Sequence, residues 1–117
     1  MSRIPFRYWH FYDYPRNLRF SVHGRFFYLH SPFLEEKDDF ATYFGVFELI
    51  GFASEEELNQ KLYGRYFPPV EMLQYIGNIS ITALDFSPRR RTDIAAIPFE
   101  AFLQEHGCLP AGKTTPP

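Results

Sequence analysis

The sequence predicts an α+β fold: a mainly antiparallel sheet of about five or six strands, with two or three short helices packed mostly on one face. Aromatic residues make up 20% of the chain, and these residue types favour strands. Apolar and polar residues alternate with period two on both sides of a two-residue turn signal near the N-terminus. The predicted strands are grouped in hairpins rather than alternating singly with helices, which favours antiparallel pairing.

The N-terminal part of the chain contains the clearest strand patterns. Residues 6–12 are predicted to form a strand because of their aromatic content. The alternation is poor, since aromatic side chains occupy both faces, and this indicates burial on two sides. Residues 14–17 contain a proline and an asparagine and are predicted to form a turn. Residues 18–22 and 25–30 then form a hairpin, whose two-residue loop is His23-Gly24 because glycine accepts the positive φ that such loops require.

The two-residue loop determines which hairpin residues share a face, because cross-strand partners lie on the same side of a sheet. One face is apolar and consists of Leu18, Phe20, Val22, Phe27 and Leu29. The other face carries Arg19, Ser21, Phe26, Tyr28 and His30. If the helices cover mostly the apolar face, this second face is open to solvent. The competing interpretation is that a helix or the first strand covers it, which would make Phe26 and Tyr28 core residues.

The middle of the chain is predicted to contain a loop, a strand and a helix. Residues 35–39 form an exposed acidic loop, and residues 42–50 form the next strand. Ser54 and Glu57 have the spacing of a capping box, in which each side chain satisfies a free backbone N–H of the other. The helix that begins there is predicted to end at Gly64.

The C-terminal part is predicted to contain a short helix over 68–77, a strand over 79–86 and an edge strand over 92–97. Pro98 suits the first position of a last helix. That helix has one stripe of large side chains, which consists of Phe99, Phe102, Leu103 and His106.

The chain length suits one domain, which we place at residues 1–107. Residues 108–117 are rich in proline, glycine and threonine and are predicted to form a flexible tail. The single cysteine, Cys108, has no partner for an internal disulfide. The N-terminus lacks the apolar core of a signal peptide, and no apolar run is long enough to span a bilayer. A cytoplasmic location without membrane contact is therefore expected.

The sequence contains no motif for a cofactor or a catalytic nucleophile. It lacks the Walker and dinucleotide glycine patterns and the Gly-x-Ser-x-Gly elbow, so we expect no cofactor. The acidic loop lacks the glycine of a calcium loop. Metal-ligand spacing is also missing among the four histidines, which are His10, His23, His30 and His106. No metal site is predicted.

A binding role therefore leads, and the sequence predicts a small non-enzymatic domain of the adaptor, inhibitor or toxin-immunity kind that binds another protein. Tyr, Phe, Trp and Arg, which are enriched in binding hot spots, are abundant here. The predicted partner-binding residues are Arg19, Phe26, Tyr28, Arg89, Arg90 and Arg91. The simpler interpretation of the arginine triplet is a solvated connection beside an edge strand.

Two alternatives stay open. The first is a single-stranded nucleic-acid binder, in which Arg89 to Arg91 contact phosphates and sheet aromatics stack on bases. The formal net charge of −2 makes that electrostatic footprint weak. The second is a small enzyme that uses Asp85 with His10 or His30, although Asp85 also suits the start of a turn.

Overall fold

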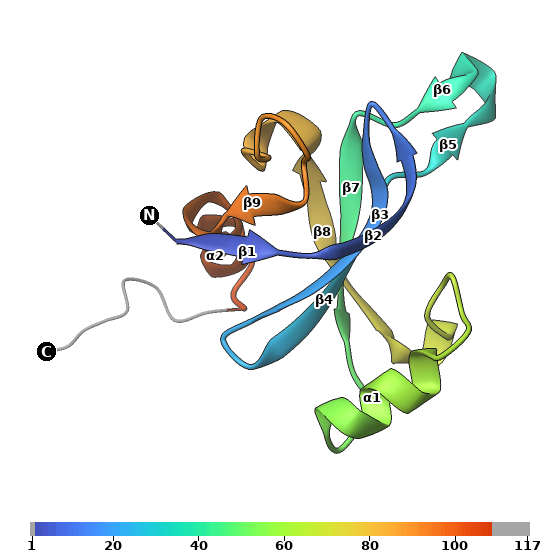
Figure 1. Cartoon of the computed structure of the whole chain (residues 1–117), viewed down its shortest axis with the longest axis vertical. Helices are drawn as coiled ribbons and strands as arrows, with labels where there is room; N and C mark the ends of the chain where they lie inside the picture. The colour runs from blue at the N-terminus through green and yellow to red at the C-terminus, as the bar shows by residue number, and fades with distance from the viewer. Residues whose placement is uncertain (1, 109–117) are drawn as a thin grey trace, which may run out of the picture.

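A computed structural model describes residues 2–108, and its main element is a five-stranded antiparallel sheet with the strand order β2-β3-β4-β7-β8 (Figure 1). The strands of this sheet are β2 Arg7–Tyr12, β3 Tyr14–Val22, β4 Arg25–His30, β7 Tyr43–Leu49 and β8 Leu73–Ser80. Two small antiparallel sheets consist of β1 Arg3–Pro5 with β9 Asp93–Ala95, and β5 Phe33–Leu34 with β6 Asp39–Phe40. The α-helices are α1 Glu55–Leu62 and α2 Ala96–Glu105. The α+β class and the antiparallel sheet are confirmed.

The β3–β4 hairpin has the register that the sequence predicts. Leu18 lies opposite Leu29 and Phe20 opposite Phe27. His23 and Gly24 both have positive φ, at 56° and 72°, as a type I′ turn requires. The local turn chemistry and the side-chain alternation therefore agree in this hairpin.

The two α-helices pack against opposite faces of the sheet. Phe99 of α2 lies in the core cluster that contains Phe27 and Leu29, whereas Leu58 of α1 lies in a second cluster with Tyr28. This arrangement differs from the expectation that the helices lie mostly on one face. The physical reason is that both faces of the hairpin carry large aromatic side chains, so each face needs its own apolar cover.

Three predicted elements differ in the structure. The chain reverses at Asp13 (φ 63°), so the predicted turn at 14–17 is instead the start of β3. The predicted helix over 68–77 is wrong, because a 3₁₀ turn at Val70–Met72 leads directly into β8, which pairs with β7. Only Ile79 and Ser80 of the predicted strand over 79–86 belong to a strand, β8; a 3₁₀ turn at Ile81–Ala83 follows, and Phe86 makes an isolated bridge to Ile94. Tertiary pairing overrides the weak local helical signal in this segment.

The helix ends follow local chemistry. The Ser54 hydroxyl accepts a hydrogen bond from the Glu57 N–H (3.2 Å), and the Glu57 carboxylate accepts one from the Ala53 N–H (2.7 Å). Pro98 is the third residue of α2 rather than its first. None of the helices within residues 2–108 is long and apolar enough to cross a membrane.

The end of the described chain is packed rather than free. Cys108 contacts the first core cluster, and its N–H donates to the carbonyl of Leu103 at 2.7 Å. Its own carbonyl accepts a hydrogen bond from Arg25. The predicted tail therefore cannot begin at Cys108, and its remaining residues, 109–117, lie outside the described part.

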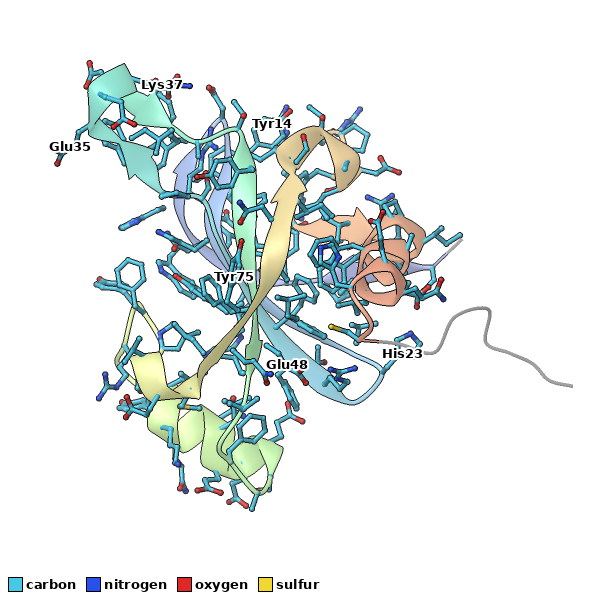
Figure 2. All side chains as sticks on the ribbon, turned by 180° about the vertical axis from the view of Figure 1, so that it is seen from behind. Tyr14, His23, Glu35, Lys37, Glu48 and Tyr75 are labelled. Atoms are coloured by element: carbon cyan, nitrogen blue, oxygen red, sulfur yellow. The ribbon has the colours of Figure 1, made fainter. Side chains whose placement is uncertain are left out.

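The acidic loop lies at the far end of a projecting hairpin. Glu35–Lys37 form a 3₁₀ turn between β5 and β6, with no buried residue. Figure 2 shows Glu35 and Lys37 at the end of the molecule remote from α1. Among residues 2–108, no group of three or more His, Cys, Asp or Glu side chains is placed to hold a metal ion.

Candidate partner-binding groove

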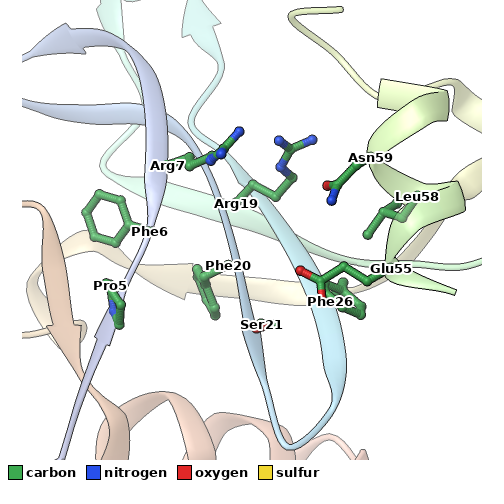
Figure 3. A pocket seen from close by; sticks show the side chains of 10 residues that line it. All are labelled: Pro5, Phe6, Arg7, Arg19, Phe20, Ser21, Phe26, Glu55, Leu58 and Asn59. Atoms are coloured by element: carbon green, nitrogen blue, oxygen red, sulfur yellow. The ribbon is translucent and has the colours of Figure 1, made fainter. Parts of the chain in front are cut away.

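Two neighbouring hollows lie between α1 and the second face of strands β2 and β3, with volumes of about 350 and 530 Å³. Arg7, Arg19 and Asn59 line both hollows, and we call the combined feature the arginine groove. Phe26 and Leu58 line the first hollow, which is shown in Figure 3. The second hollow is also lined by Trp9, Tyr63, Arg65 and Tyr66.

Arg7 and Arg19 meet because they are direct cross-strand partners between β2 and β3. Figure 3 shows their guanidinium groups extending toward Asn59 of α1, whereas the carboxylate of Glu55 lies beside Phe26. Within residues 2–108, neither arginine side chain makes an ion pair or a hydrogen bond. Burial lowers the pKa of Arg19, and the neighbouring charge of Arg7 lowers it further. Like charges placed opposite each other destabilise a sheet, so this pair works against folding.

Aromatic side chains surround the second hollow. Trp9 stacks on Tyr28 with ring centroids 6.0 Å apart, and the buried indole N–H of Trp9 has no hydrogen-bond partner among the described residues. Tyr63 and Tyr66, which follow α1, are 88% and 71% exposed. The second hollow is therefore bordered by Trp9 on the sheet side and by the exposed Tyr63 and Tyr66 on the loop side.

A polar cluster centred on Asn17 lies behind this wall. The Asn17 Oδ1 accepts a hydrogen bond from the Tyr28 hydroxyl at 2.8 Å and lies 2.7 Å from the Nδ1 of His30. The Asn17 Nδ2 lies 3.4 Å from the Nδ1 of His10. His10 has a φ of 61°, and its ring stacks on Tyr66 at 6.3 Å. One buried amide thus connects three strands of the sheet.

Burial lowers the pKa of His30, and the nearby His10 lowers it further. With His30 neutral, a hydrogen bond to the Asn17 Oδ1 requires the proton on Nδ1. The contacts of Asn17 therefore connect β2, which carries Trp9, and β3, which carries Arg19, to β4.

The predicted patch of Arg19, Phe26 and Tyr28 is only partly a surface. Arg19 is half-buried in the arginine groove. Phe26 lines the first hollow and packs edge-on against Phe52, with centroids 5.5 Å apart. Tyr28 is only 2% exposed, so its assignment to an open face is wrong; α1 and Trp9 cover it. This burial raises the pKa of the Tyr28 phenol.

The predicted residues Arg89, Arg90 and Arg91 lie on a different part of the molecule. Arg89 and Arg90 are exposed in a turn. Arg91 donates to the carbonyl of Asp13 and lies 4.3 Å from the centre of the Tyr14 ring. It lines a separate hollow of about 280 Å³. The six predicted partner-binding residues therefore do not form one site.

The residues of the suggested enzyme are also separated. Asp85 lies 3.7 Å from the guanidinium of Arg3, and its backbone carbonyl accepts from the same side chain at 3.1 Å. His10 and His30 lie beside Asn17 instead. Within the described part of the chain, Asp85 makes no hydrogen bond or ion pair with either histidine.

Several groove residues were not predicted from the sequence, and they are Arg7, Trp9, Asn59, Tyr63, Arg65 and Tyr66. A signal for the first two was present, because a reversal centred on Asp13 places Arg7 opposite Arg19 and Trp9 opposite Asn17. The turn assigned to 14–17 concealed that register. The residues on and after α1 have no local signal, since only the packing of the helix brings them to the strands.

No protein family, curated protein sequence or solved structure matches this chain. The functional argument therefore depends on the geometry of the groove and on the chemistry of its side chains.

Proposed function

We propose that this protein is a small binding domain of the adaptor, inhibitor or toxin-immunity kind, and that it binds another protein through the arginine groove. The observation that carries the proposal is the cross-strand pair of Arg7 and Arg19, which shares a hollow with aromatic side chains and has no counter-ion in residues 2–108. A like-charged pair lowers stability, so its presence here is better explained by a ligand than by folding.

The aromatic composition of the groove supports a protein partner. Trp, Tyr and Arg are the residue types that contribute most to binding hot spots. Trp9 is held in place by Tyr28, whereas Tyr63 and Tyr66 are open to solvent. A soluble protein does not need large exposed aromatic side chains around a hollow, so these side chains favour a binding surface.

The other suggested sites have less geometric support. Arg91, which the nucleic-acid alternative needs for phosphate contact, already contacts Asp13 and Tyr14. Arg89 and Arg90 remain exposed, but they line none of the hollows that carry the exposed tyrosines. They are therefore suitable as a control site for experiments on the groove.

The proposal is tested by comparing three immobilised proteins in extracts of the native cells: wild type, Tyr63→Ala/Tyr66→Ala and Arg89→Ala/Arg90→Ala. The extracts are used with and without nuclease treatment, and captured proteins are quantified by mass spectrometry. A captured protein is then purified and its affinity for each variant is measured by calorimetry. Because hot-spot truncations typically cost 2 kcal/mol or more, we expect the tyrosine variant to bind at least about tenfold more weakly.

The control variant is expected to bind like wild type. Equal binding of the purified partner to the tyrosine variant and to wild type would contradict the proposal. Loss of all captured protein after nuclease treatment would favour a nucleic-acid ligand instead.

A further inference from the structure

Resting on the proposed function, the geometry points to the chemistry of the partner: we infer that the segment in the arginine groove is acidic, and that one of its carboxylates lies between Arg7 and Arg19. The inference starts from the contrast between these arginines and the others. Arg3 pairs with Asp93 at 2.8 Å and Arg25 pairs with Glu48 at 2.6 Å. Arg3 and Arg25 thus have carboxylate partners, whereas the two groove arginines lack them.

Other arginines within residues 2–108 reinforce the contrast. Arg16 is buried, and its guanidinium donates to the carbonyls of Tyr12 and Ala41 and to the hydroxyl of Ser31. Arg91 contacts a backbone carbonyl. The other described arginines without such contacts are exposed, and they are Arg7, Arg65, Arg89 and Arg90. Arg19 is therefore unusual, because it is half-buried and without an acceptor.

The charged side chains that line the second hollow are all arginines. Arg7, Arg19 and Arg65 supply guanidinium N–H groups to the second hollow, and no carboxylate of the described chain lines it. The first hollow contains one carboxylate, that of Glu55, which Figure 3 places beside Phe26 rather than between the arginines. A ligand that supplies acceptors is the chemical complement of this surface.

A carboxylate fits between Arg7 and Arg19 for a geometric reason. Directly opposed residues of an antiparallel pair have Cβ atoms about 5 Å apart, so two guanidinium groups reach one anion. Each guanidinium offers a planar fork that matches the two oxygens of a carboxylate. The anion also removes the repulsion between the two cations.

The remaining walls distinguish an acidic polypeptide from a nucleic-acid strand. Phe26 and Leu58 give the first hollow an apolar wall that suits an apolar side chain next to the carboxylate. A nucleic-acid strand requires a basic track along its length, but the formal net charge of this chain is −2. The complementary ligand is thus a short segment that alternates acidic and apolar residues.

The test uses a blocked pentapeptide that alternates glutamate and leucine, and a matched peptide with glutamine in place of each glutamate. Dissociation constants are measured by NMR titration for wild type, Arg7→Gln/Arg19→Gln and Arg89→Gln/Arg90→Gln. Both variants remove two positive charges, so a difference between them reports position rather than net charge. We expect wild type to bind the glutamate peptide about tenfold more tightly than the glutamine peptide, as one good charge-assisted contact provides.

This preference should fall below about twofold in the groove variant and persist in the control variant, with both variants folded by their NMR spectra. Equal affinity of wild type for the two peptides, no measurable binding, or a preference that survives Arg7→Gln/Arg19→Gln would overturn the inference. Tighter binding of a ten-nucleotide thymidine strand than of the glutamate peptide would overturn it in favour of nucleic acid. The capture experiment with Tyr63→Ala/Tyr66→Ala remains independent, because a protein partner lost in that variant supports the proposed function even if this preference is absent.

Discussion

The Asn17 cluster gives the most quantitative prediction about the strands that form the groove. Asn17 is 1% exposed and accepts hydrogen bonds from the Tyr28 hydroxyl and from His30. Asn17→Leu keeps the number and branching of the side-chain heavy atoms but leaves the hydroxyl of Tyr28 without this acceptor. Leaving a buried polar group unsatisfied costs about 1–3 kcal/mol. The substitution also removes the contact between the Asn17 Oδ1 and His30. We therefore expect Asn17→Leu to lower the free energy of unfolding by about 2–3 kcal/mol.

This value can be checked by thermal and urea denaturation, followed by circular dichroism and by the fluorescence of Trp9. For a chain of 117 residues, 1 kcal/mol corresponds to roughly 4 °C in melting temperature, so the expected decrease is about 10 °C. Tyr28→Phe alone should cost about 1 kcal/mol. The double variant should lose about 1–2 kcal/mol less unfolding free energy than the two single variants lose in sum, because both partners of the hydrogen bond are then absent.

The chain contains a matched control pair on the surface. The Tyr75 hydroxyl donates to the Asn78 Oδ1 at 2.8 Å, the same chemistry and distance as in the buried pair, but Tyr75 is 57% exposed. Asn78→Leu should change stability by no more than about 0.5 kcal/mol, because water replaces the lost contact. If Asn17→Leu costs no more than Asn78→Leu, or if the effects of Asn17→Leu and Tyr28→Phe are simply additive, the structural role assigned to the cluster is refuted.

Three further predictions concern the turn, the pH dependence and the arginine pair. Gly24→Val should cost about 1–2 kcal/mol in urea denaturation because φ is positive there, whereas Gly24→Asn should cost less; equal stability of the valine variant and wild type would contradict the turn assignment. Since the pKa of His30 is lowered from 6.5 by burial and by His10, the unfolded chain takes up its proton at a higher pH than the native protein. Stability should therefore fall as the pH decreases from about 7 toward 5, and less steeply in His30→Gln; identical urea midpoints against pH in both proteins would argue against this. Arg7→Gln should leave the melting temperature equal or raise it by an amount equivalent to a few tenths of a kcal/mol, because it relieves repulsion with Arg19; a marked decrease would show that Arg7 stabilises the fold.

The local elements of this fold could be predicted because their causes lie within a few residues of sequence. The His23-Gly24 turn determines the register of β3 and β4, and the alternation of side chains agrees with it. Ser54 and Glu57 cap α1 through contacts three and four residues apart. In each case the partners are neighbours in the chain, so no knowledge of the distant structure was needed.

The helical signal at 68–77 failed because β8 is stabilised by its pairing with β7, a contact that local sequence does not contain. The burial of Tyr28 likewise depends on where α1 packs, since the alternation of residues shows only that Tyr28 lies opposite the face of Phe27. Which face is exposed is a property of the assembled layers.

The same division applies to the groove. The α+β class, the hairpin register and the abundance of aromatic and arginine side chains follow from composition and short-range spacing. That Arg7 and Arg19 share a hollow with Asn59 of α1, and that Arg91 lies in a different one, depends instead on how the elements pack. The physical reason is that a groove is made from the side chains of separate elements, and their relative positions depend on which apolar faces pack together.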